Sequence, residues 1–174
     1  MDFKNKKVLI TGGCSGIGKI MARKSLERGV SNLIIWDINE EGLAKTKEEF
    51  ANFGKEISTY KVDVSNLDEI KNAAQRVRTE VGKVDILINN AGIVVGKYFH
   101  EHTHENITKS MMINSDAPMH ITLEFLQGMM KENSGAICNI ASSAGLISNP
   151  KMSVYAASKW AVNGWSDSLR LEMQ

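Results

Sequence analysis

Short apolar runs alternate with longer amphipathic stretches along the whole chain. The runs consist mostly of aliphatic and β-branched residues and end at glycine or a polar side chain. This pattern is typical of strands buried on both faces of a parallel sheet. We expect strands at residues 6–11, 33–37, 57–62, 84–89 and 136–141.

The stretches between these runs have helical periodicity. From Leu67 to Val81 apolar residues recur every three or four positions, Ser65 stands where it can cap the start, and Gly82 stands where it can end the helix. Equivalent patterns predict helices at residues 16–28, 40–52, 65–83, 105–132 and 154–171.

Regular alternation of strand and helix favours an α/β fold with a parallel sheet, because each right-handed crossover lays its helix on a face of the sheet. The length of 174 residues suits one such domain, residues 1–174, and is short for two. In this architecture ligands bind beyond the carboxyl ends of the strands.

Composition narrows the class of partner. Lys plus Arg number 21 against 20 Asp plus Glu, and no basic stripe is present, so we expect no nucleic-acid partner. No segment has the ~20 apolar residues that span a bilayer, and the start lacks a cleavage pattern, so we expect no membrane segment and a cytoplasmic location. Cys14 and Cys138 belong to no metal-ligand pattern. We therefore expect no metal site and a small-molecule partner.

A glycine-rich segment, TGGCSGIG at residues 11–18, follows the first predicted strand and begins the first predicted helix. Backbone N–H groups and the dipole at such a helix start favour a phosphate. The spacing is T-G-x-x-x-G-x-G instead of the usual G-x-G-x-x-G. On its own, the segment is equally compatible with a tight turn.

Asp37 ends the second predicted strand, nineteen residues after Gly18. A carboxylate there can bind the ribose hydroxyls of an adenosine and repel a 2′-phosphate, which favours NAD over NADP. The alternative is an acid that favours the start of the next helix. The loop and Asp37 also leave a methyltransferase that uses S-adenosylmethionine open.

Five motifs, in a fixed order along the chain, distinguish an NAD-binding enzyme from a methyltransferase. They are TGGCSGIG at 11–18, Asp63 with Val64, Asn89-Asn90-Ala91-Gly92, Ser142 in NIASSAG, and YAASK at 155–159. With this set, which methyltransferases do not carry, essentially the whole chain resembles the short-chain dehydrogenase/reductase (SDR) family. WDIN at 36–39 and NIASSAG also resemble the branch of that family that oxidises steroids and retinoids.

The resemblance implies a Rossmann-like doubly wound sheet with strand order 3-2-1-4-5, which lacks the further strands of the family's C-terminal substrate-binding end. It also implies a homodimer or homotetramer that interconverts secondary alcohols and ketones, or aldehydes, with NAD. The residues that it implies in cofactor binding are Gly12, Ser15, Gly16, Ile17, Gly18, Asp37, Asp63, Val64, Asn90, Ala91, Gly92, Tyr155 and Lys159. The alternative is a non-catalytic protein, either regulatory or truncated, that holds NAD without turnover.

YAASK supplies the candidate acid and base. A free tyrosine titrates near pH ~10, and a nearby ammonium favours its phenolate. Tyr155 and Lys159 are four residues apart and so share one helix face, and Ser142 can donate a hydrogen bond to a substrate oxygen. By resemblance Tyr155 exchanges the proton, Ser142 stabilises the oxygen, and Lys159 tunes the tyrosine and binds the ribose. For an isolated Y-x-x-x-K, the alternative is an amphipathic helix with a snorkelling lysine.

Two further residues carry two interpretations each. Pro118 has no N–H to bond the carbonyl of Asn114, four residues back, which predicts a free carbonyl at a kink. In the SDR family the matching carbonyl holds a water of a proton relay, so the resemblance makes Asn114 catalytic; a kink without function is the alternative. By resemblance Asp63 bonds the adenine amino group, and otherwise it caps the following helix.

Overall fold

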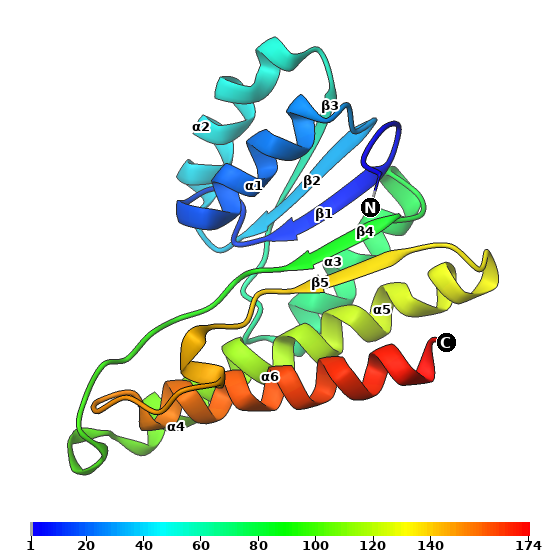
Figure 1. The fold of residues 1–174 in the computed structure, drawn as a ribbon. Helices are drawn as coiled ribbons and strands as arrows, with labels where there is room; N and C mark the ends of the chain where they lie inside the picture. Colours follow the sequence, from blue (N-terminus) through cyan, green and yellow to red (C-terminus); the bar gives the residue numbers. More distant parts are fainter. Residues whose placement is uncertain (1) are drawn as a thin grey trace. The chain divides into compact units, whose positions relative to one another are not determined.

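The computed structural model describes residues 2–174, and its elements alternate as the sequence predicts (Figure 1). The strands are β1 (Lys7–Thr11), β2 (Asn32–Asp37), β3 (Glu56–Lys61), β4 (Ile86–Asn89) and β5 (Ala136–Asn139). The helices are α1 (Gly16–Glu27), α2 (Glu40–Phe50), α3 (Leu67–Glu80), α4 (His104–Met111), α5 (Ala117–Lys131) and α6 (Ser153–Glu172).

The five strands form one sheet in the order β3-β2-β1-β4-β5. The central strand β1 pairs in parallel with β2 and with β4, and β2 pairs in parallel with β3. The predicted Rossmann-like fold and strand order are therefore confirmed. Thr11 at the end of β1 lies beside Trp36 of β2, so the segments that follow these two strands leave the sheet at the same edge.

The chain forms two compact units. Unit 1 comprises the residues up to Ala91 together with His120–Cys138, and unit 2 comprises Gly92–Met119 and Asn139–Gln174.

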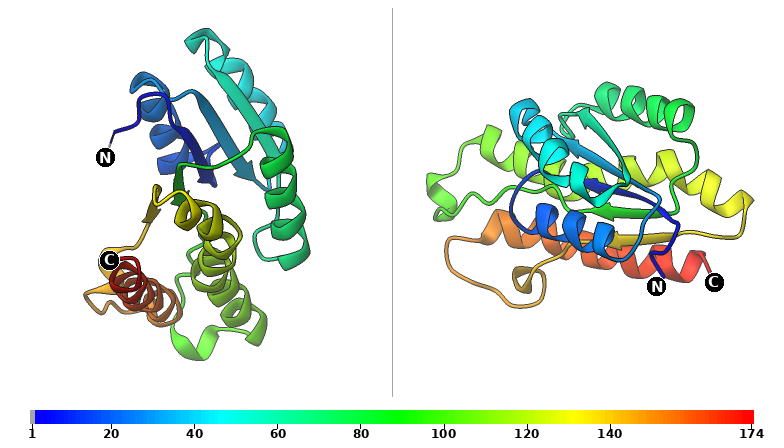
Figure 2. Two further views of the ribbon diagram at one scale, coloured as in Figure 1. Left: turned by 90° about the vertical axis from the view of Figure 1, so that its right-hand side faces the viewer. Right: turned by 90° about the horizontal axis from the view of Figure 1, so that it is seen from above.

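The core of unit 1 lies around β1 and β2, whose aliphatic residues are fully buried and stabilise the fold by about 1.5–3 kcal/mol each. Helix α1 packs on β1 and β2, and α2 packs on β2 and β3. Helix α3 lies on the other side of the sheet from α1 (Figure 2). The ring of Trp36 in β2 lies 5.9 Å from that of Phe125 in α5. Arg78 of α3 also donates hydrogen bonds to Glu124 of α5.

Helix α6 packs against most of the other elements of unit 2. It contacts α4, the turn Met112–Asp116 and the 3-10 turn Ser143–Gly145. Val154, Ser158 and Val162 are buried at intervals of four residues, as expected for a helix with one face packed inward. No helix within residues 2–174 is long and apolar enough to cross a membrane.

The single helix predicted at residues 105–132 is two helices joined by a π-helical turn. Helix α4 ends at Met111, and in the turn Met112–Asp116 the N–H of Ala117 bonds the Met112 carbonyl, five residues back. Pro118 then lies in the first turn of α5, where a missing N–H is tolerated. The proline therefore interrupts the α-helix with a wider turn.

The start of α3 also differs from the prediction. Its cap is Asn66, whose Oδ1 accepts hydrogen bonds from the N–H groups of Asp68 (3.0 Å) and Glu69 (3.3 Å). The predicted cap at Ser65 is wrong, because the Ser65 hydroxyl donates to Asp63 instead. The predicted end is confirmed: Gly82 has a φ of +93°, and its N–H bonds the Val77 carbonyl at 2.9 Å.

Candidate active site

The glycine segment between β1 and α1 is closely packed around Gly12, Gly13 and Gly18. A Cβ on Gly18 would overlap the Gly12 carbonyl oxygen and lie 2.5 Å from Nδ2 of Asn90. A Cβ on Gly12, whose φ is +65°, would lie 3.0 Å from the same nitrogen. Only glycine fits at residue 18 without moving backbone, which explains the spacing of the sequence motif.

The segment that follows β4 is tied to this loop. Nδ2 of Asn90 donates to the carbonyls of Thr11 (2.9 Å) and Gly12 (3.2 Å). The Thr11 hydroxyl accepts hydrogen bonds from the N–H groups of Asn90 and Ala91, both at 3.0 Å. In the sequence Thr11 is recognisable only as the start of the glycine motif, and its hydrogen bonds to residues about 80 positions away follow from no local pattern. Asn90 acts on the loop through its side chain, while its predicted cofactor contact stays a prediction.

The start of α1 has the features of a phosphate site. Ser15 is the N-cap but makes no side-chain cap bond, and the first turn has no acidic residue. Gly16 has a φ of +48° and nothing within 4 Å of where a Cβ would lie, and Ile17 is exposed. The first N–H groups of a helix have no partner within the helix, so they are available to an anion. The residues present therefore fit the phosphates of a dinucleotide.

Asp37 is held at the edge of this loop. Its Oδ2 accepts a hydrogen bond from the Cys14 N–H at 3.2 Å, and its Oδ1 accepts one from the Asn39 N–H at 3.0 Å. The alternative interpretation is an acid that favours the start of α2. Asp37 does lie just before that helix and bonds the Asn39 N–H, but the residue that caps the helix is Asn39. Burial, with the Asp37 carboxylate adding to it, raises the pKa of the Cys14 thiol to about 12. Cys14 is therefore an inert thiol at neutral pH.

Asp63 and Val64 follow β3 in unit 1, and both are half-buried. Oδ1 of Asp63 accepts hydrogen bonds from the N–H (2.9 Å) and the hydroxyl (2.6 Å) of Ser65. Its N–H donates to Glu69 of α3 at 2.8 Å. Asp63 thus shapes the turn before α3 without capping the helix, so the predicted capping role is wrong. Its contact with adenine stays a prediction.

Tyr155 and Lys159 lie together on α6. Nζ of Lys159 is 5.8 Å from the centre of the Tyr155 ring and donates a hydrogen bond to the Ile140 carbonyl at 2.8 Å. Lys159 is buried, and burial lowers the pKa of its ammonium. Tyr155 is half-buried. A buried cation beside a half-buried phenol is an arrangement that can support proton transfer.

Ser142 follows β5 and begins the 3-10 turn Ser143–Gly145. Its Oγ accepts a hydrogen bond from the Ala144 N–H at 3.2 Å, and its carbonyl accepts one from the Gly145 N–H at 2.9 Å. As an acceptor in the first of these bonds, the hydroxyl keeps its hydrogen for another group. Ser142 can therefore donate to a substrate oxygen.

The buried side chain of Asn114 joins two segments of unit 2. Its Oδ1 accepts from the Ile93 N–H at 2.8 Å, and its Nδ2 donates to the Ile93 carbonyl at 2.9 Å and to the Ser158 hydroxyl at 3.1 Å. Ser158 in turn donates to the Tyr155 carbonyl at 2.7 Å. The sequence pattern around Pro118 indicates only the backbone carbonyl of Asn114, and no local pattern indicates its side-chain hydrogen bond to Ser158. The proton relay through that carbonyl stays a prediction.

The structure thus assembles the predicted residues in two groups. Unit 1 holds the glycine loop with Asp37, Asp63, Val64, Asn90 and Ala91. Unit 2 holds the exposed Gly92 together with Asn114, Ser142, Tyr155 and Lys159. Among the described residues no group of three or more His, Cys, Asp or Glu side chains could hold a metal ion.

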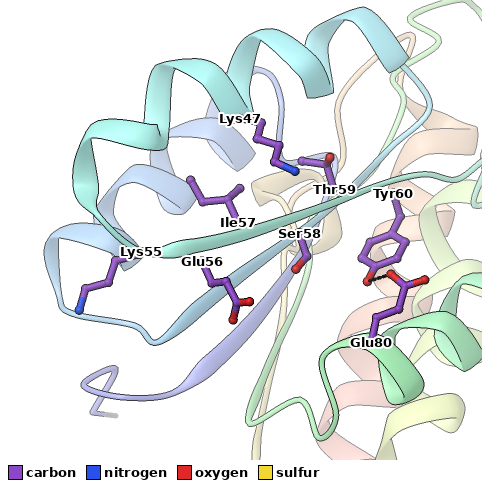
Figure 3. A pocket seen from close by; sticks show the side chains of 8 residues that line it. All are labelled: Lys47, Lys55, Glu56, Ile57, Ser58, Thr59, Tyr60 and Glu80. Atoms are coloured by element: carbon purple, nitrogen blue, oxygen red, sulfur yellow. Dashed lines mark hydrogen bonds between the residues drawn. The ribbon is translucent and has the colours of Figure 1, made fainter.

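An open pocket of about 490 Å³ lies elsewhere in unit 1, along β3 (Figure 3). It contains none of the predicted site residues. Its wall includes Tyr60, whose hydroxyl donates to Glu80 of α3 at 2.9 Å. The other lining residues are Lys47, Lys55, Glu56, Ile57, Ser58 and Thr59.

Comparison of the sequence with known proteins gives a consistent result. The family described as short chain dehydrogenase matches residues 6–174. Estradiol 17-beta-dehydrogenase 11 of Pongo abelii is 39% identical over 166 residues, which are 95% of this chain and 55% of that protein. Retinol dehydrogenase 10-A of Danio rerio is 35% identical over 189 residues, covering 95% of this chain and 56% of that protein. The chain spans about half the length of these curated relatives.

Solved structures agree. NAD⁺-bound xylitol dehydrogenase matches with a TM-score of 0.93 and 28% identity, over 99% of this chain and 66% of that one. A metagenomic short-chain oxidoreductase in complex with NADP matches with a TM-score of 0.93 and 29% identity, over 99% of this chain and 78% of that one. One of these relatives therefore binds NAD and the other NADP.

Proposed function

The chain belongs to the short-chain dehydrogenase family, and from this premise we propose that it forms the catalytic part of an NAD(H)-dependent oxidoreductase. The reaction is the interconversion of a secondary alcohol and a ketone, or an aldehyde. The observation that carries the proposal is the pairing on α6 of Tyr155 with the buried ammonium of Lys159, 5.8 Å from the ring centre.

The residues of unit 1 would hold the dinucleotide. The N–H groups at the start of α1 would bind its phosphates, and Asp37 would accept hydrogen bonds from the adenosine ribose. A nicotinamide cofactor supplies hydride transfer when bound. Asp37 supports NAD over NADP, because its carboxylate, held by the Cys14 and Asn39 N–H groups, would repel a 2′-phosphate.

The residues of unit 2 would perform the proton chemistry. Tyr155 gives a proton to the substrate oxygen during reduction and takes it during oxidation. The positive charge of Lys159 stabilises the phenolate that this leaves. The Ser142 hydroxyl donates a hydrogen bond to the same substrate oxygen and stabilises the charge that develops there.

An apolar substrate is supported by the exposed side chains of unit 2. Leu146 and Ile147, which follow the turn that begins at Ser142, are 69% and 65% exposed. Exposed apolar side chains next to polar catalytic groups are typical of binding sites for apolar ligands. The names of the relatives above, an estradiol dehydrogenase and a retinol dehydrogenase, agree with this class of substrate.

A homodimer or homotetramer in the cytoplasm completes the proposal. Trp160 and Leu171 on α6 are 53% and 61% exposed, and exposed large apolar side chains on a helix support its contact with a second copy.

The test is turnover by the full-length protein with NAD and a set of apolar secondary alcohols, followed by the absorbance of NADH. Tyr155→Phe should lower kcat by about 10²–10⁴-fold, because it removes the acid/base, while NAD binding persists. The matched control is Tyr60→Phe in unit 1, which loses only a hydrogen bond to Glu80 and should keep normal turnover. Binding of NAD without turnover of any alcohol would favour the non-catalytic alternative.

A further inference from the structure

Asn163 extends the line of Tyr155 and Lys159 along α6. It follows Lys159 by four residues and Tyr155 by eight, so all three side chains lie along one side of the helix. Its Nδ2 donates a hydrogen bond to the Gly145 carbonyl at 3.0 Å. The helix that carries the proposed acid/base thus also holds the turn that begins at Ser142.

Gly145 connects that hydrogen bond to Ser142. Its N–H bonds the Ser142 carbonyl at 2.9 Å, and Oγ of Ser142 accepts from the Ala144 N–H at 3.2 Å within the same turn. The peptide groups on the two sides of Gly145 are therefore both engaged, one with Ser142 and the other with Asn163. A shift of Gly145 relative to α6 would carry Ser142 with it.

The turn also rests directly on the backbone of α6. A Cβ on Gly145 would lie 2.8 Å from Nδ2 of Asn163 and 3.0 Å from the Lys159 carbonyl oxygen. Any larger residue would push the turn away from the helix. Gly145 is needed because of this close approach and not because of its backbone conformation, since its φ is not positive.

A second attachment lies on the other side of Ser142. Nζ of Lys159 donates to the Ile140 carbonyl at 2.8 Å. Ser142 is thus bracketed by two backbone carbonyls, at residues 140 and 145, that both bond side chains from a single turn of α6. Two attachments on either side of one residue restrict its position more than either would alone.

We propose that Asn163, acting through Gly145, is a positioning residue for Ser142. It sets where the serine hydroxyl lies relative to the helix that carries Tyr155. This inference rests on the proposed oxidoreductase function, because it gives Asn163 its effect through Ser142.

The variant that tests the hydrogen bond is Asn163→Asp, which keeps the shape of the side chain but replaces the donor by a carboxylate. We expect kcat to fall on the order of tenfold, since misplacing a reacting group by about 1 Å can cost 10²-fold. The KM for NAD should not change. Introduced into Ser142→Ala protein, the same substitution should have no further effect on kcat, because the residue through which it acts is gone.

The chain offers a matched control. Asn139 of β5 donates to the Ser166 hydroxyl of α6 at 2.8 Å, which also joins α6 to β5 but not to the turn. Ser166→Ala should therefore keep kcat within about twofold of the wild type. Asn163→Gln, which keeps the donor on a longer side chain, should restore part of the lost rate.

Two results would overturn the inference. The first is an Asn163→Asp effect of the same size in the presence and absence of Ser142. The second is a loss of thermal stability with unchanged kcat for the protein that remains folded.

Failure of the proposed function is distinguishable from failure of the inference. If the wild type turns over no alcohol, the proposed function fails, and amide hydrogen exchange then decides whether Asn163 holds the turn. Exchange of the Gly145, Leu146 and Ile147 N–H groups, which bond within the turn, should be faster in Asn163→Asp than in Ser166→Ala protein. Equal exchange in the two variants would overturn the inference.

Discussion

Replacement of Gly18 by alanine separates two ways in which the glycine loop depends on glycine. A Cβ there would overlap the Gly12 carbonyl oxygen and lie 2.5 Å from Nδ2 of Asn90. A Cβ on Gly16 would have nothing within 4 Å. Gly16 has a φ of +48°, so Gly16→Ala meets only the strain of a left-handed backbone, about 1–2 kcal/mol.

The loss at Gly18 is larger because two effects add. Forcing a methyl group into a closed site costs about 1–3 kcal/mol. The methyl also displaces the Asn90 side chain, whose hydrogen bonds to the Thr11 and Gly12 carbonyls contribute about 1 kcal/mol each. The expected loss is about 3–5 kcal/mol. At about 2–4 °C per kcal/mol it lowers Tm by roughly 6–20 °C, against about 2–8 °C for Gly16→Ala.

Thermal and urea unfolding of the two variants, followed by circular dichroism, measure the difference. Both variants carry the same added methyl group within one loop, so the contrast compares close packing at residue 18 with backbone strain at residue 16. Equal losses of stability, or a larger loss for Gly16→Ala, would refute the argument from close packing.

Three further predictions concern charge. In steady-state kinetics, Asp37→Ser should raise the ratio of kcat/KM with NADP to kcat/KM with NAD by roughly tenfold, which corresponds to about 1.4 kcal/mol. An unchanged ratio would show that Asp37 does not select the cofactor. Burial lowers the pKa of Lys159, so stability should rise with pH between that lowered pKa and the ordinary lysine value of 10.5. In urea unfolding, the stability of the wild type relative to Lys159→Met should therefore increase as the pH rises toward 10.5, whereas a constant difference would contradict the linkage. Burial also raises the pKa of Cys14 and of Cys138, so iodoacetamide at about pH 8 should label neither thiol until the protein unfolds; rapid labelling of the native protein would contradict this.

The fold was predictable from the sequence because its signals are local and repeated. Near-continuous apolar runs identified all five strands to within two residues, as in the pattern that gives β1 at Lys7–Thr11. The strand order came from the resemblance to a family. Apolar periodicity also located the helices, since each has one face packed inward.

What the sequence did not predict depends on contacts between distant residues or on competing caps. Pro118 indicated an interruption, but the proline alone does not decide between a kink and the π-helical turn that forms. Ser65 and Asn66 are both residue types that cap helices well. The Ser65 hydroxyl donates to the Asp63 carboxylate, so Asn66 caps α3. The hydrogen bond of Asn163 to Gly145 joins residues 18 apart through a turn whose path no local pattern specifies.

The bond between the Thr11 hydroxyl and the Asn90 N–H has a consequence for the order of folding. It joins residues 79 positions apart, and β4, which precedes Asn90, pairs with β1. Contacts of such sequence separation form slowly, because a long loop must close first. During synthesis Asn90 must leave the ribosome before this bond can form, although β1 and α1 are made earlier. The glycine loop therefore stays without this bond until the chain has been translated through Asn90, 79 residues after Thr11.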